Sequence, residues 1–151
     1  MEINDVIYEE ENGKVKVEFR VGCLRQKGVW ALFGKESVQS DYICLNVGKC
    51  VDVGYEIIYD IGCMKQIEFR NDGEKEYINQ FGESCKFKYK KNQVQEYLYP
   101  FIKSCNYYAL KFVLVHNENC LDKEREYAIE HQAKFWRNGK PYEKAKVGVS
   151  E

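Results

Sequence analysis

A tight turn near the amino terminus constrains the fold of this chain more than any other feature. Asn12-Gly13 stands between two runs rich in apolar residues, at positions 6–10 and 15–21. Asparagine and glycine accept the positive φ angles that a two-residue hairpin turn requires. The second run places alternate apolar side chains on one face of a strand: Val15, Val17, Phe19 and Val21. Residues 1–21 therefore predict an N-terminal β-hairpin.

Three further apolar runs predict strands. Residues 29–33 and 42–47 are joined by a polar connection, and residues 109–115 form a third run near the end of the chain. Continuous apolar runs of the length of the first two are typical of strands that are buried on both faces. We therefore expect a strand over each of the three runs.

The stretch 51–61 fits two patterns. Val53, Ile57 and Ile61 recur at helical spacing, whereas isoleucine and tyrosine alternate over residues 55–61. Because isoleucine and tyrosine prefer strands, we expect a strand here.

Two later segments predict helices, and a turn precedes them. Residues 92–104 carry an amphipathic pattern that continues past Pro100. Residues 122–136 place Ile129, Ala133 and Trp136 on one stripe, and Asn119 or Asp122 is suited to cap that helix. Residues 71–73 read Asn-Asp-Gly and indicate a turn.

Composition limits the fold class and the compartment. The chain has 151 residues, 44% of them hydrophobic, which suits a single domain with a real core. Its 23 basic and 24 acidic residues exclude a polycation but permit a local basic face. We find neither a signal-peptide pattern nor a run of about 18 apolar residues, so we expect a cytoplasmic protein with no membrane partner. The sequence predicts one α+β domain over residues 1–151, with a small mixed or antiparallel sheet flanked by helices.

The cysteines indicate reduced thiols, with no zinc site. No two of the seven stand at Cys-x-x-Cys spacing, and their number is odd: Cys23, Cys44, Cys50, Cys63, Cys85, Cys105 and Cys120. Gly48-Lys49 is not a phosphate loop, because Ile43 stands where the first glycine is needed and Cys50 replaces the Ser or Thr. We therefore expect no nucleotide cofactor.

The order of three short segments carries a family resemblance. Gly28-Val29-Trp30 opens one strand, Asn46-Val47-Gly48-Lys49 ends the next, and a helix over 124–130 carries glutamates. This order resembles the GIY-YIG nuclease family, in which a Gly-x-Tyr strand pairs with a Tyr-x-Gly strand. A helix then presents an arginine, and a later helix presents a glutamate. The resemblance covers residues 28–60 and 109–141, so it implies a core over 28–141 with an insertion at about 62–108.

The resemblance implies metal-dependent phosphodiester hydrolysis. In the family, a tyrosine activates water, a glutamate holds a divalent cation such as Mg²⁺ or Mn²⁺, and an arginine with a lysine or histidine steadies the phosphate. On this sequence Lys49 matches the basic group, and Glu130, with Glu126 as second choice, matches the metal ligand.

Other family positions hold different side chains. Trp30 and Asn46 stand at the two tyrosine positions, and Glu56 stands at the arginine position. Arg70 replaces that arginine if the segment between is an insertion, and Tyr42 or Tyr55 is near enough in sequence to supply the phenol.

A basic strand gives separate support for nucleic-acid binding. Lys86, Lys88 and Lys90 alternate with aromatic residues, and Lys91 extends the charge. Three ammonium groups on one strand face suit phosphate contact. The same pattern fits an edge strand whose lysines discourage pairing with another chain.

Two functions follow as alternatives. The first is a GIY-YIG-like endonuclease, or a protein derived from one, acting on nucleic acid, with DNA favoured over RNA. The second is a catalytically inactive module of the same fold that contacts nucleic acid or a protein partner. For some of these residues a purely structural role is an alternative to the functional one. Trp30 also suits a core aromatic residue, and Glu126 and Glu130 also suit solvated ion pairs. A cleft that holds Trp30, Asn46 and Glu56 but no phenol would favour the second function.

Overall fold

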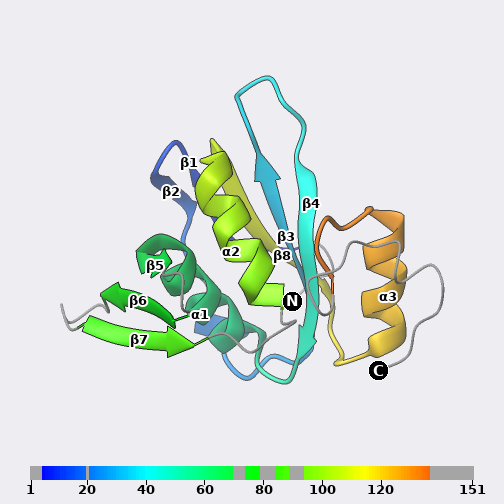
Figure 1. The fold of residues 1–151 in the computed structure, drawn as a ribbon. Coiled ribbons are helices and arrows are strands. Elements are labelled where there is room, and N and C mark those ends of the chain that lie inside the picture. The colour runs from blue at the N-terminus through cyan, green and yellow to red at the C-terminus, as the bar shows by residue number, and fades with distance from the viewer. Residues whose placement is uncertain (1–4, 20, 70–73, 79–83, 89–93, 137–151) are drawn as a thin grey trace.

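The computed structural model describes residues 5–19, 21–69, 74–78, 84–88 and 94–136. Over these residues the chain forms two antiparallel sheets and three α-helices, an α+β arrangement (Figure 1). The strands are β1 Asp5–Glu11, β2 Lys14–Val17, β3 Gly28–Lys35, β4 Ile43–Cys50, β5 Ile67–Phe69, β6 Glu74–Ile78, β7 Ser84–Lys88 and β8 Ala109–His116. The helices are α1 Val53–Gln66, α2 Val94–Cys105 and α3 Leu121–Glu130, with a short 3₁₀ turn, η1, at Val21–Cys23.

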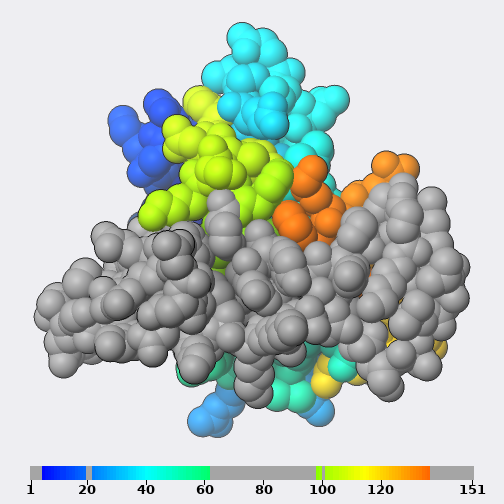
Figure 2. Space-filling model, in the orientation of Figure 1, coloured from blue at the N-terminus to red at the C-terminus, as the bar shows by residue number. Residues whose placement is uncertain are grey.

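The larger sheet has five strands in the order β2-β1-β8-β3-β4, and every neighbouring pair is antiparallel. The smaller sheet, β5-β6-β7, lies between α1 and α2 in the sequence. The connection from β3 to β4 projects away from the rest of the molecule (Figure 2). The predicted strands at 29–33, 42–47 and 109–115 are thus confirmed, and the structure places all three in the larger sheet.

The larger sheet is covered on both faces. Trp30 and Leu32 belong to a core shared with α1 and α2, while Val29 and Ala31 belong to a second core that contains Ala128 of α3. Alternate residues of β3 thus face opposite layers, as the pleat of a strand requires. Figure 1 shows α1 and α2 on one side of the sheet and α3 on the other. The prediction that this run is buried on both faces is confirmed.

The N-terminal hairpin is confirmed, but it is shorter than expected. Asn12 and Gly13 adopt φ angles of 51° and 78°, and β1 pairs with β2 across them. The second strand ends at Val17, and Val15 is exposed. Because β2 is the outer strand of the sheet, the chain leaves it early and continues into η1, whose Cys23 is buried.

The strand expected over 51–61 is wrong, because this segment forms the start of α1. Val53 and Ile57 are fully buried four residues apart, whereas Tyr55 and Ile58 are exposed. Burial therefore follows the helical spacing and not the alternation. An Asp52 Oδ1 atom accepts the Tyr55 backbone N–H at 3.0 Å and caps the helix.

The two later helices were expected, with one error in their bounds. Helix α2 continues through Pro100, as predicted. Helix α3 ends at Glu130 instead of 136, and its N-cap is Cys120, with no side-chain cap from Asn119 or Asp122. Beyond the helix, the backbone N–H groups of Lys134 and Phe135 donate to the carbonyls of Cys44 and Leu45, respectively. The chain therefore pairs with β4 at this point and does not continue as a helix.

Some expectations fall on parts of the chain that the structure does not describe. The turn over residues 71–73 lies outside the described residues, although β5 and β6 on either side pair antiparallel. Of the cysteine side chains that are described, Cys23 and Cys44 are buried and Cys50, Cys105 and Cys120 are partly buried, all as free thiols. Among the described helices, none has the length and apolar character needed to cross a membrane.

Candidate functional site

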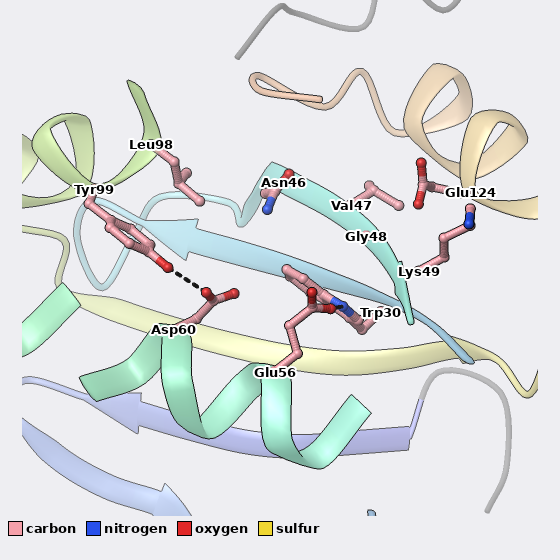
Figure 3. A pocket seen from close by; sticks show the side chains of 10 residues that line it. All are labelled: Trp30, Asn46, Val47, Gly48, Lys49, Glu56, Asp60, Leu98, Tyr99 and Glu124. Carbon is pink, nitrogen blue, oxygen red and sulfur yellow. Dashed lines mark hydrogen bonds between the residues drawn. The ribbon is translucent and has the colours of Figure 1, made fainter. Parts of the chain in front are cut away.

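A pocket of about 190 Å³ opens where the outer strand β4 meets α1 and α2. Its lining comes from β3, β4, α1, α2 and α3 and includes polar side chains from strands and helices alike (Figure 3). The lining residues are Trp30, Asn46, Val47, Gly48, Lys49, Glu56, Asp60, Leu98, Tyr99 and Glu124.

A β-bulge turns Asn46 into this pocket. Leu32 pairs with Asn46, but the next residue, Phe33, pairs with Cys44, so Leu45 is the extra residue in β4. In a regular strand Leu45 and Asn46 would face opposite sides of the sheet. Here Leu45 enters the core shared with α1 and α2, while Asn46 lines the pocket on the same side. Bulges often re-aim a side chain in this way beside functional sites.

Gly48 lets β4 lie directly on the Trp30 indole. These two residues are opposite each other in the β3–β4 pairing. A Cβ atom at position 48 would come within 2.7 Å of the indole ring, which is much closer than a carbon atom can approach. A glycine at this position therefore allows the buried tryptophan to form the floor of the pocket.

Two carboxyl groups of α1 receive hydrogen bonds from aromatic side chains. Trp30 Nε1 donates to Glu56 Oε2 at 2.6 Å, and the Tyr99 hydroxyl donates to Asp60 Oδ1 (Figure 3). Glu56 and Asp60 are four residues apart, so they lie on the same face of the helix. Burial raises the pKa of Asp60 to about 7; the Tyr99 hydrogen bond opposes this rise and the Glu56 charge adds to it.

A third carboxyl group reaches the pocket from α3. Glu124 is buried, and its Oε1 atom accepts a hydrogen bond of 2.9 Å from Trp136 Nε1. Lys49 is the one basic side chain among the described lining residues, and its ammonium donates to Asn119 Oδ1 at 3.3 Å. The lining therefore holds three carboxyl groups and one ammonium group, so it is acidic overall.

The Asn46 side chain is the one amide in the lining. Asn46 is only 4% exposed. Its side chain reaches from β4 into the pocket (Figure 3). Within the part of the chain that the structure describes, this side-chain amide has no hydrogen-bond partner. Because the amide opens to the pocket and is not sealed in the core, it can bind a ligand.

The structure brings together four of the residues that the sequence singled out. Trp30, Asn46, Lys49 and Glu56 line one pocket. Trp30 is also a core residue, 3% exposed, so the two roles considered for it coexist.

Sequence reasoning missed three other lining residues, Asp60, Tyr99 and Glu124. The four-residue spacing of Glu56 and Asp60 would have indicated a shared face only if α1 had been recognised as a helix. Tyr99 and Glu124 carry no comparable local signal, because distant segments bring them to the pocket.

Other predicted site residues lie elsewhere. The Tyr42 hydroxyl donates to Glu9 Oε2 at 3.1 Å, away from the pocket lining. Tyr55 is exposed on α1. Glu126 and Glu130 are exposed on α3, where Glu126 forms an ion pair of 3.4 Å with Lys123.

The structure describes only some of the basic residues that were proposed to bind nucleic acid. Arg70, Lys90 and Lys91 lie outside the described residues. Lys86 and Lys88 belong to β7, an outer strand of the smaller sheet, and their Cα partners in β6 are Glu76 and Glu74. A strand at this position was expected, and its contact with nucleic acid stays a prediction.

The side chains at the pocket do not form a ready site for Mg²⁺ or Mn²⁺. Carboxylate oxygens are suitable ligands for these ions, but several must converge on one point. Among the described residues, no group of three or more His, Cys, Asp or Glu side chains is arranged to hold a metal ion. Glu56, Asp60 and Glu124 are instead each held by a different aromatic donor.

Comparison with known proteins found no match to any protein-family model, to any curated protein or to any solved structure.

Proposed function

We propose that this chain is a GIY-YIG-like domain that has lost phosphodiester hydrolysis and uses the pocket beside β4 to bind a protein partner. One observation carries the proposal. Glu56 stands at the position that the resemblance gives to the phosphate-binding arginine, and the Trp30 indole holds its carboxylate in the pocket at 2.6 Å. The charge at the centre of the site is therefore opposite to the charge that a phosphate requires.

The arrangement of the strands supports the family part of the proposal. β3 carries Gly28-Val29-Trp30 and pairs directly with β4, which carries Asn46-Val47-Gly48. The next helix, α1, presents Glu56 to the pocket, and a later helix, α3, carries glutamates. This is the order of parts that the resemblance implies. The glutamate of α3 that lines the pocket is Glu124, and not Glu130 or Glu126, to which the resemblance gave the metal.

Charge argues against phosphate binding. Hydrolysis of a phosphodiester needs positive groups where the transition state accumulates negative charge. Lys49 is the one cation among the described lining residues, and the same lining holds three carboxyl groups. In a partly buried site carboxylate charges are weakly screened, so they repel a phosphate. Asp60, whose pKa is raised to about 7, adds only part of a charge near neutral pH.

The groups that would move a proton are also unsuitable. The Trp30 indole and the Asn46 amide occupy the two tyrosine positions, and neither accepts a proton at neutral pH. A general base must be able to accept the proton of the attacking water. The loss of the phenols at these two positions favours binding over catalysis. The pocket is not without a phenol, however, because Tyr99 of α2 also lines it.

A second candidate, an active nuclease with relocated groups, has one observation in its favour. Tyr99 supplies a phenol, Lys49 an ammonium and Glu124 a carboxylate to the same pocket. These are the chemical types that the family uses, although they come from other positions of the chain.

A cleavage assay separates the two candidates. The purified protein is incubated with single- and double-stranded DNA and RNA in the presence of Mg²⁺ or Mn²⁺. We expect no cleavage above that of a Tyr99→Phe variant. Cleavage that is lost in Lys49→Ala and Tyr99→Phe, but kept in the exposed-residue variant Glu36→Gln, would overturn the proposal in favour of the nuclease.

A further inference from the structure

The pocket continues into a second hollow along the start of α1. This second hollow, about 320 Å³, shares Glu56 and Asp60 with the first and extends over Val51, Tyr55 and Tyr59. Val51 and Tyr55 are 63% and 68% exposed, which is unusual for side chains with so much apolar surface. The two hollows together offer an acidic pocket beside an apolar shelf.

The acidic groups are regularly spaced around the two hollows. Asp52, which caps α1, and Glu56 and Asp60 within α1 follow one another at four-residue intervals, and all three line this surface. Glu124 adds a further carboxyl group from the far side of β4. Lys49 is the one basic side chain in the described lining of the two hollows. Its ammonium already donates a hydrogen bond to Asn119.

The hydrogen-bonding capacity of the pocket is not used up. A carboxylate accepts about four hydrogen bonds. Glu56 is hydrogen-bonded to the Trp30 indole and to the Cys50 thiol, and Asp60 receives one hydrogen bond from Tyr99. The Asn46 amide opens into the same space and has no hydrogen-bond partner within the described residues. A ligand with several N–H groups in one plane would satisfy these acceptors together.

We propose that the joined hollows bind a segment of a partner protein, with an arginine side chain in the pocket and a neighbouring apolar side chain on Val51 and Tyr55. This inference rests on the proposed binding function. A guanidinium presents five N–H donors in a rigid fork that matches carboxylate and amide oxygens, and it is less strongly hydrated than an ammonium. The apolar shelf beside the pocket favours a peptide over a free cation, and the acidic lining disfavours nucleic acid.

Titration of the isotope-labelled protein with a capped peptide, acetyl-Leu-Arg-Leu-amide, tests this inference. The readout is the indole N–H resonance of Trp30, because that group donates to Glu56 inside the pocket. We expect saturable shifts with a dissociation constant of about 1 mM or lower. The matched peptide with citrulline in place of arginine keeps the shape but has no charge, and we expect it to bind at least about tenfold more weakly.

Substitutions test the acidic pocket and the apolar shelf separately, by their effect on peptide binding. Glu56→Gln keeps an acceptor for the Trp30 indole but removes the charge, so we expect it to weaken the arginine peptide at least about tenfold. Tyr55→Ser changes an exposed residue that the fold does not need, so we expect a several-fold loss through the apolar contact. Glu36→Gln, an exposed change in the β3–β4 connection, should bind as the unaltered protein does.

Several results would overturn the inference. These are no saturable shift at about 5 mM arginine peptide, equal binding of the citrulline peptide, or equal binding by Glu56→Gln. A failure of the peptide together with an absence of cleavage would reject the ligand and leave the proposed binding function standing. Metal-dependent cleavage that is lost in Lys49→Ala and Tyr99→Phe would reject both.

Discussion

Asp60 shows how a single side chain links the pocket to stability. It is a buried carboxyl group that receives the Tyr99 hydroxyl, and its pKa is raised to about 7, chiefly by burial. Because the folded protein holds the Asp60 proton more tightly than the unfolded chain does, protonation favours folding. The stabilising contribution is complete below the ordinary aspartate pKa and is lost as the pH rises through about 7.

The Asp60→Asn variant isolates this effect. An asparagine can still accept the Tyr99 hydroxyl but does not titrate. We expect the unaltered protein to lose about 3 kcal/mol of unfolding free energy between about pH 4 and about pH 8, relative to Asp60→Asn. Urea denaturation of both proteins across this range measures the difference. Parallel pH dependence of the two proteins would contradict a raised Asp60 pKa.

Gly48 offers a second test at the scale of one residue. A methyl group at this position would meet the Trp30 ring at 2.7 Å, and the ring is buried and unable to move aside freely. We expect Gly48→Ala to reduce the free energy of unfolding by about 1–3 kcal/mol. Gly22→Ala is the matched control, since nothing lies within 4 Å of a Cβ there. A similar change in both variants would show that close packing on Trp30 is not the cause.

Among the elements, α1 is the one whose type the sequence pattern predicted wrongly. The alternation of tyrosine and isoleucine over 55–61 favours a strand, but the helix buries Val53 and Ile57 against the sheet and brings Glu56 and Asp60 to one pocket. Intrinsic preference for a strand is weak compared with burial of an apolar face. The capping position of Asp52 was the local signal that could have identified the helix.

Two neighbouring isoleucines of α1 test this assignment. Ile57 is 0% exposed and Ile58 is 48% exposed, so the same substitution has different consequences. We expect Ile57→Ala to reduce the free energy of unfolding by about 2–5 kcal/mol and Ile58→Ala by less than about 1 kcal/mol. Chemical denaturation of both variants measures this. Equal losses would be inconsistent with the observed burial of the helix.

Helix α3 shows a different limit of sequence patterns. Ala133 and Trp136 are buried, as the predicted helical stripe requires, yet the helix ends before them at Glu130. Gln132 adopts a φ angle of 53°, and the chain then runs beside β4. An apolar stripe specifies which residues are buried, but several backbone paths bury the same residues.

At the scale of the molecule, the larger sheet separates two cores. β3 and β8 occupy its interior, with β1 and β4 on either side of them. Phe112 belongs to the core of α1 and α2, while Val113 belongs to the core of α3. Since both faces are covered, the central strands contribute to both cores, and we expect the fold to open last at these strands.

Hydrogen exchange of the native protein tests this organisation. We expect the hydrogen-bonded amides of β3 and β8 to exchange most slowly among the described strands, with opening free energies close to that of global unfolding. The amides of the outer strand β2 should exchange faster by at least about tenfold. Protection of β2 equal to that of β8 would contradict the central position of β8.

Local patterns determined much of this protein. The Asn12-Gly13 turn, the apolar strands β3, β4 and β8, and helix α2 follow from backbone preferences and periodicity of short segments. Four pocket residues, Trp30 and Glu56 among them, were also named from sequence, through an order of motifs. Tertiary contacts decided the helical form of α1, the end of α3, the bulge at Leu45 and the arrival of Tyr99 and Glu124 at the pocket. The reason is physical: a short segment encodes which of its faces is apolar, whereas the partner that covers this face is supplied by distant parts of the chain.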